Sequence, residues 1–144
     1  MRVVLDTNQL VAALLRPPEL ATFVMAWESA RFTVIASPAL IAEYLHVLAY
    51  PEIAELIYPE LLRAFQSHLL QDVELVEPSE VPRVCRDPDD DTVVAAAIYG
   101  LADFILTVDQ DLMAPEIAVV LGQMGISITT GATLIQLLDS TAAS

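Results

Sequence analysis

The stretch Val3-Val4-Leu5-Asp6-Thr7-Asn8 joins a short apolar run to three polar residues in succession. An apolar run of this length, beginning almost at residue 1, predicts a strand that is buried on both faces, as strands of parallel sheets are. Asp6, Thr7 and Asn8 then follow the carboxyl end of that strand. Ligands of open α/β sheets bind outside the carboxyl ends of the strands, so a functional site is expected at this edge.

Strands and helices alternate along the rest of the chain. Ser37-Pro38, for example, pairs a capping hydroxyl with proline at the first helical position. The predicted strands are 3–5, 32–36, 73–76, 104–107 and 126–128. The predicted helices are 9–15, 19–30, 38–49, one or two within 51–70, 92–101, 117–124 and 132–138. This alternation predicts a single three-layer α/β domain over residues 1–139, with a mainly parallel sheet flanked by helices, and a short tail over 140–144.

The composition excludes several classes of protein. Hydrophobic residues make up 56% of the 144 residues, which argues against disorder. No apolar run approaches the roughly 18 residues of a membrane-spanning helix, and Arg2 followed by Asp6 is unlike a signal peptide. The single cysteine, Cys85, excludes an internal disulfide and a cysteine-rich metal site. We therefore expect a cytoplasmic protein that does not associate with a membrane.

The charge of the chain is unusual. Twenty acidic residues stand against six arginines, no lysine is present, and the net charge is −14. Such a chain repels nucleic acid at long range, which counts against a general nucleic-acid binder. The charge is compatible with an enzyme whose acids are partly neutralised by a metal ion. It also fits a protein whose partner carries a basic segment.

Four acidic residues fall at the predicted carboxyl edge of the sheet. Asp6 and Asp109 follow the first and fourth strands, Glu43 lies in the helix after the second strand, and Asp91 opens the alanine-rich helix. Several carboxylates converging on one crevice would repel each other without a cation. Their hard oxygen atoms suit Mg²⁺ or Mn²⁺.

Each of these residues also has a purely structural interpretation. Asp6 and Asp91 are both good helix caps, Asp109 is a common kind of turn residue, and Glu43 could lie on a solvated helix face. The four residues together are more informative than any one of them, although they do not by themselves name a reaction.

Two other kinds of site fit the sequence poorly. The acidic run 87–91 does not form a calcium loop, because Thr92 stands at the sixth position and Ile98 at the twelfth. An aspartyl-phosphate phosphatase would carry an aspartate where Asn8 stands and would use a lysine. His46 and His68 have no neighbours in sequence that suggest a catalytic triad.

Four segments of the chain resemble, in order, the acidic motifs of PIN-domain nucleases. Val3–Asn8 resembles the opening motif, and Ser37–Glu43 resembles the segment that bears the glutamate of the family. Cys85–Asp91, running into Val93–Ala97, resembles the third motif, and Ala102–Leu112 the fourth. The resemblance extends from residue 3 to about 128. Four motifs in this order are specific, whereas the first alone would be weak.

This resemblance implies hydrolysis of RNA phosphodiester bonds with one or two Mg²⁺ or Mn²⁺ ions. Asp6, Asp91 and Asp109 would bind the metal, and Glu43 would complete its shell directly or through water and help to orient the attacking water. Asp90 and Asp91 compete for the third acidic position, and Asp91 is preferred because its spacing to the helix fits. The residues assigned supporting roles are Thr7, Asn8, Asp90 and Asp111.

Within the family, the chain is most similar to the toxins of toxin–antitoxin pairs of the VapC type. This implies RNA as the substrate, an antitoxin with a basic segment as the partner, and a homodimer as a candidate assembly. The alternative from a different class is a non-catalytic acidic module that keeps the PIN-like fold and binds a basic peptide. A metal titration combined with a nuclease assay would separate the two.

Overall fold

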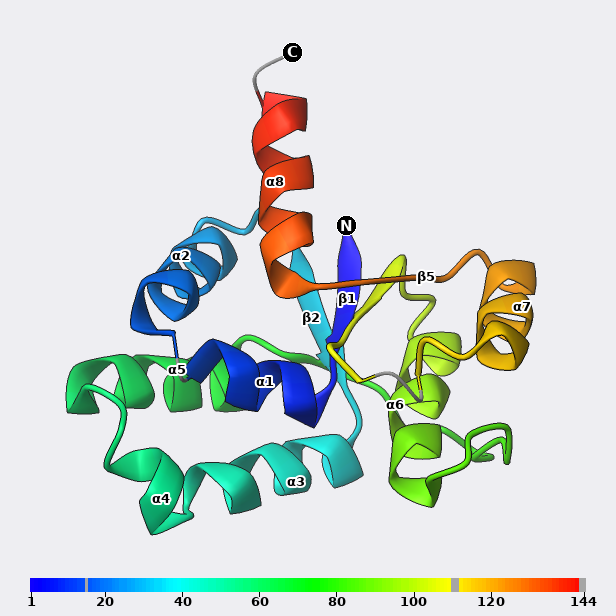
Figure 1. The fold of residues 1–144 in the computed structure, drawn as a ribbon, viewed down its shortest axis with the longest axis horizontal. Helices are drawn as coiled ribbons and strands as arrows, with labels where there is room; N and C mark the ends of the chain where they lie inside the picture. Colours follow the sequence, from blue (N-terminus) through cyan, green and yellow to red (C-terminus); the bar gives the residue numbers. More distant parts are fainter. Residues whose placement is uncertain (15, 110–111, 143–144) are drawn as a thin grey trace.

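The computed structural model describes residues 1–14, 16–109 and 112–142, in which strands and helices alternate (Figure 1). The strands are β1 (Arg2–Leu5), β2 (Thr33–Ala36), β3 (Glu74–Leu75), β4 (Phe104–Leu106) and β5 (Ser127–Thr129). The helices of the described residues are α1 (Thr7–Leu14), α2 (Pro17–Glu28), α3 (Pro38–Leu48), α4 (Pro51–Ala54), α5 (Pro59–Gln71), α6 (Pro88–Tyr99), α7 (Pro115–Gln123) and α8 (Gly131–Ala142).

The strands form one five-stranded sheet in the order β3-β2-β1-β4-β5, and every neighbouring pair is parallel. The predicted α/β fold with a mainly parallel sheet is confirmed. The chain moves outward from β1 to β2 and β3 and then returns to β4 on the other side of β1. The carboxyl ends of β1 and β4 therefore meet where the strand order reverses, which is the usual place for a ligand in such sheets.

Helices cover both faces of the sheet, as the three-layer prediction requires. Helix α6 contacts β1, β2 and β4, and α7 contacts β5, while α2 contacts α1, α5 and α8. Figure 1 shows α2 and α5 on one side of the strands and α6 and α7 on the other. None of the helices in the described residues is both long and apolar enough to span a bilayer.

The core forms because the strands are apolar on both faces. Val3, Val4, Val34, Ile35 and Ile105 are fully buried. A cluster of aromatic rings connects α2, α5 and the residue before β2. Its members are Phe23, Trp27, Phe32 and Phe65. Burying a large apolar side chain contributes about 1.5–3 kcal/mol, so this core holds the strand ends in fixed positions.

Helix α6 lies close against the sheet because its residues are small. Ala95, Ala96 and Ala97 are buried, and the helix ends at Gly100. A Cβ atom at Gly100 would lie 2.5 Å from the Cγ2 atom of Ile35, closer than carbon atoms approach one another. Glycine is therefore required here for the approach of α6 to β2.

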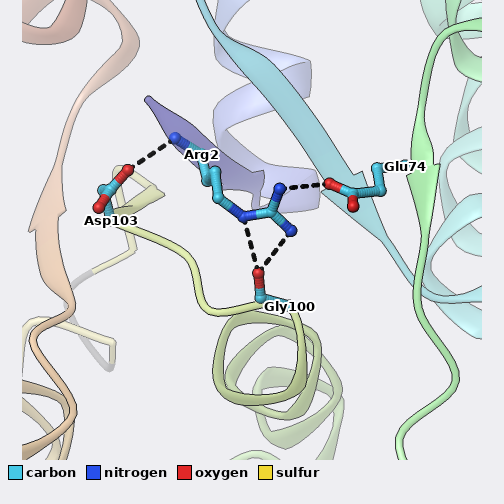
Figure 2. Close-up of polar contacts among 4 residues, drawn as sticks. All are labelled: Arg2, Glu74, Gly100 and Asp103. Carbon is cyan, nitrogen blue, oxygen red and sulfur yellow. Dashed lines mark hydrogen bonds and ion pairs between the residues drawn. The ribbon is translucent and has the colours of Figure 1, made fainter.

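The amino edge of the sheet is fastened by Arg2 (Figure 2). The Nε and Nη2 atoms of Arg2 donate to the carbonyl oxygen of Gly100 at 3.0 and 2.7 Å, and Nη1 pairs with Glu74 Oε2 at 2.5 Å. Its backbone N–H donates to Asp103 Oδ2 at 2.8 Å. One side chain thus connects β1 with the end of α6 and with β3.

Several helix boundaries differ from those predicted. Helix α6 begins at Pro88 rather than Thr92, and its cap is Asp87, whose Oδ1 accepts from the N–H of Asp89 at 3.0 Å. The prediction that Asp91 opens this helix is therefore wrong, because Asp91 lies in the first turn. Helix α8 extends to Ala142 and includes the start of the segment 140–144 that was predicted as a tail.

Candidate active site

The carboxyl edge of the sheet carries a cleft of about 330 Å³ outside the ends of β1 and β4. Six of the residues that line it are acidic, and none of its described lining residues is basic. They come from segments far apart in the sequence, which the parallel topology brings to one edge. The acidic residues are Asp6, Glu43, Asp87, Asp89, Asp90 and Asp109, and the others are Thr7, Asn8, Val11, Val47, Tyr50 and Ile53.

Asp6 is the most deeply placed of these acids, being 3% exposed. Its backbone N–H donates to the carbonyl of Leu106 at 2.9 Å, and the Thr107 hydroxyl donates to its Oδ2 atom at 2.7 Å. Burial raises the pKa of the Asp6 carboxyl, the bond from Thr107 lowers it in part, and the charges of Asp109 and Glu43 raise it. The net pKa lies above its ordinary value mainly because the acid is buried, and the neighbouring negative charge adds to the rise.

Thr107 connects two of the acids and was missed by the sequence interpretation, which treated it as the last strand residue. It is fully buried, donates to Asp6 and accepts the backbone N–H of Asp109 at 2.9 Å. Asn8 then donates from Nδ2 to Asp109 Oδ2 at 3.0 Å. A hydroxyl at the end of an apolar strand, two residues before an aspartate, is the signal that could have identified Thr107.

Helix α3 contributes Glu43 and, next to it, Tyr44. Glu43 lines the cleft, as predicted from its place at the border of the apolar face. Tyr44 is fully buried, and its hydroxyl donates to the carbonyl of Leu5, the residue before Asp6. Burial and the charges of Asp6 and Glu43 raise the pKa of Tyr44 well above its ordinary value, so it remains a donor. The sequence interpretation placed Tyr44 in the core and did not foresee this bond.

The two candidates for the third acidic position, Asp90 and the preferred Asp91, lie in different surroundings. Asp90, and not Asp91, is among the described residues that line the cleft. Asp91 is equally buried but accepts, through Oδ1, from the backbone N–H groups of Val84 at 3.0 Å and Cys85 at 2.8 Å. Asp91, in the first turn of α6, therefore holds the preceding loop through its Oδ1 atom.

One predicted supporting residue, Thr7, differs from expectation. Thr7 lines the cleft, but its hydroxyl is buried and has no hydrogen-bond partner within the described part of the chain. Asp111 lies outside the described residues.

The donor set of the cleft fits a hard divalent cation. Its acidic groups are carboxylates, which supply the oxygen ligands that Mg²⁺ and Mn²⁺ prefer. Burial is the main cause of the raised pKa of Asp6, and the charges of Asp109 and Glu43, which a cation would offset, add to it. In the described residues no three such side chains are already close enough together to hold one ion. Binding would therefore draw the carboxylates inward.

A second cavity, of about 260 Å³, lies apart from the acids between α1, α2, α5 and the start of α8. Its described lining is mostly apolar, with Leu10, Phe23, Phe65 and Ile135 among its walls, and contains no acidic, basic or histidine side chain. It offers no group for hydrolytic chemistry, so the acidic cleft is the candidate active site.

Comparisons with known proteins identify the family of the chain. The family model described as the PIN domain matches residues 2–111, a range that contains Asp6, Glu43, Asp90 and Asp109. A comparison with curated proteins and a comparison with solved structures each gave no match. PIN domains are typically nucleases that use divalent metal ions. Because the match covers most of the chain and the parallel sheet agrees with it, this protein belongs to the PIN-domain family.

Proposed function

We propose that this protein is a metal-dependent endoribonuclease that hydrolyses RNA phosphodiester bonds. The observation that carries the proposal is the cleft itself, in which Asp6, Glu43, Asp90 and Asp109 meet without a basic residue among its described walls. Carboxylates gathered in one cleft repel each other, which is costly for a fold. Their cost is offset once they bind a cation, which is the condition under which such a site acts on phosphodiesters.

Asp6, Asp90 and Asp109 are the residues that would hold one or two Mg²⁺ or Mn²⁺ ions. Asp90 replaces Asp91 in this set, because Asp90 lines the cleft and Asp91 binds loop backbone. A bound ion supplies Lewis acidity towards the phosphodiester and lowers the pKa of water.

Side chains of the protein hold the acids of the site in place. Tyr44 holds the carbonyl of Leu5, and Thr107 holds the carboxylate of Asp6 and the backbone of Asp109. Asn8 orients the Asp109 side chain. Glu43 orients the attacking water, whose oxygen forms a bond to phosphorus as the bond to the leaving ribose oxygen breaks. Once an ion has drawn the carboxylates together, a site held in this way needs little reorganisation during the reaction.

RNA cleavage by Asp6→Asn tests the proposal. The change removes one charge with no change in volume, and the amide oxygen can still accept from Thr107. A mixed RNA pool is incubated with wild type and variant in Mn²⁺, with and without chelator. Wild type is expected to cleave only with metal, and the variant not at all. Equal cleavage by both proteins would contradict the assignment of Asp6.

We also propose that the enzyme is the toxin of a toxin–antitoxin pair. An arginine-bearing segment of an antitoxin would pair bidentately with the carboxylates of the cleft and block it. The net charge of −14 would speed this encounter. Co-purification with the product of the neighbouring gene at low and high salt, and a size measurement that detects a homodimer, are the tests. Failure to form a complex at low salt would count against the role.

The second candidate function is a non-catalytic acidic module that binds a basic peptide. The six acids of the cleft and the strongly negative charge favour it as well. The two functions separate in the cleavage assay: a module of this kind binds a basic peptide but leaves RNA intact at every metal concentration.

A further inference from the structure

The arginines of this chain are few, and most of them are occupied within the fold. Arg2 binds Glu74 and Gly100, Arg31 pairs with Asp139 at 3.0 Å, and Arg63 donates to the carbonyl of Pro59 at 3.3 Å. Arg16 is engaged as well. Two arginines remain from the total of six.

These two, Arg83 and Arg86, share one groove. Both are exposed, and within residues 1–14, 16–109 and 112–142 neither guanidinium makes a hydrogen bond or an ion pair. They line a groove of about 450 Å³ between the loop before α6 and the start of α7. Glu116, in the first turn of α7, lies on the opposite wall. The groove thus presents two cations on one side.

The groove adjoins the acidic cleft and is held firmly beside it. Asp87, the residue after Arg86, already lines the cleft. Two hydrogen bonds connect the loop to α6, because Asp91 accepts from the backbone N–H groups of Val84 and Cys85, which lie between the two arginines. Asp91 is the neighbour of Asp90 in α6, so a single turn of helix positions both an acid of the cleft and the basic groove.

We propose that Arg83 and Arg86 bind the phosphate backbone of the single RNA strand whose scissile bond lies in the acidic cleft. This inference rests on the proposed ribonuclease function and names the residues that position its substrate. The cleft and most of the surface repel a polyanion, so a strand that enters needs cationic contacts close by. Guanidinium groups bind phosphate oxygens bidentately and stay charged at every relevant pH. Glu116 confines the strand to the loop side of the groove.

The test compares the double variant Arg83→Gln, Arg86→Gln with Arg63→Gln. Arg63 is exposed on α5, which lies on the opposite side of the molecule from α7 (Figure 1). The double variant is expected to raise KM for a single-stranded oligoribonucleotide about tenfold or more at low salt while kcat at saturation is retained. The slope of log KM against log salt should fall by about 1.4, the value for two phosphate contacts on a single strand. Arg63→Gln should change neither.

A binding measurement distinguishes failure of this inference from failure of the proposed function. Anisotropy of a fluorescent oligoribonucleotide is followed with Mn²⁺ on the Asp6→Asn background, where cleavage is blocked. If wild type cleaves RNA and the double variant has the same KM and the same salt dependence, the inference about the arginines is wrong, while the proposed ribonuclease function is retained. RNA binding that depends on both arginines, without cleavage by wild type, supports the RNA-binding role of the groove and contradicts the proposed ribonuclease function. Normal RNA binding by the double variant, together with loss of a poly-glutamate peptide that wild type binds, assigns the groove to an acidic protein and overturns the inference.

Discussion

The two edges of the sheet treat charge in opposite ways. At the amino edge, Arg2 satisfies Glu74 and the carbonyl of Gly100 with one guanidinium, and its N–H binds Asp103 (Figure 2). At the carboxyl edge, six acids line one cleft, and none of its described lining residues is basic. The contrast teaches that the fold can pair its charges where only stability is needed. The unbalanced charge at the carboxyl edge is therefore the better marker of function.

The largest effect is expected when the cleft loses a charge. Asp90→Asn should lower kcat/KM for RNA by at least about a hundredfold, because metal binding contributes several kcal/mol to transition-state stabilisation. Asp91→Asn is the matched control on the adjacent residue. Its amide oxygen can still accept from Val84 and Cys85, so cleavage should stay within about tenfold of wild type. Cleavage rates in Mn²⁺ measure both, and the reverse order would return Asp91 to the third position.

The next largest effect is expected on thermal stability when Mn²⁺ is added. Mn²⁺ should stabilise the folded protein by about 2.7 kcal/mol at a hundredfold excess over its dissociation constant. The charge of Asp109 raises the pKa of Asp6, which shows that the two carboxylates repel each other. Asp109→Asn should therefore raise the melting temperature of the metal-free protein and reduce the shift that Mn²⁺ causes.

Thermal melts with chelator and with Mn²⁺ decide this prediction. Arg2→Gln, at the amino edge, is the control and should keep the full metal shift. If Mn²⁺ does not change the melting temperature of the wild-type protein, these acids do not form one metal site.

Breaking the amino edge should cost stability and spare catalysis. Arg2→Gln leaves Glu74 without its ion pair and the Gly100 carbonyl without two donors. The expected loss is about 1–2 kcal/mol of unfolding free energy, since the side chain is partly exposed and an exposed ion pair adds little. Denaturant unfolding measures the loss, and kcat should be unchanged at a temperature where the variant is folded. A loss of kcat without a loss of stability would contradict the division between the edges.

The smallest effect concerns a charge pair away from both edges. His68, on α5, pairs through Nε2 with Glu28 of α2 at 3.1 Å and through Nδ1 with Asp72. Burial lowers the pKa of His68, but the hydrogen bonds to Asp72 and Glu28 outweigh it and hold the pKa above 6.5. The folded protein therefore binds this proton more tightly than the unfolded chain does. The resulting stability is complete below pH 6.5 and is lost as the pH rises through the higher folded value.

His68→Gln should remove this pH dependence, which amounts to roughly 0.2–1 kcal/mol for a pair at the surface. Unfolding free energies on both sides of the transition measure it. His46→Gln is the control, because His46 contacts the hydroxyl of Tyr50 rather than a carboxylate. An identical change of stability with pH in wild type and His68→Gln would show that the pair contributes nothing.

Much of the fold and part of the site could be predicted from the sequence. Strands such as Val3–Leu5 are apolar on both faces because helices cover both sides of the sheet, so they stand out as short apolar runs. Asp6 and Asp109 follow two of these strands closely. Since parallel strands end at one edge, their meeting there follows from the strand assignments alone, and Glu43 joins them through its place on the helix face.

The choice between Asp90 and Asp91 required the tertiary structure. Successive helical residues point about 100° apart, so the decision depends on where α6 begins and on what packs around it. The Asp87 cap defines the start of α6, and the bonds from Val84 and Cys85 engage Asp91, which is why Asp90 is the residue proposed for the cleft.

The sequence by itself determined which segments are buried and which acids stand at the strand ends, because burial on both faces leaves a local pattern of apolar residues. Only the tertiary structure decided which side chains hold those acids. Thr107 reaches Asp6 across 101 residues, and Tyr44 reaches Leu5 across 39. Arg2 likewise fastens the opposite edge through Glu74 and Gly100. Such bonds depend on how strands and helices pack together, so a local pattern can mark a candidate such as Thr107 but cannot identify its partner.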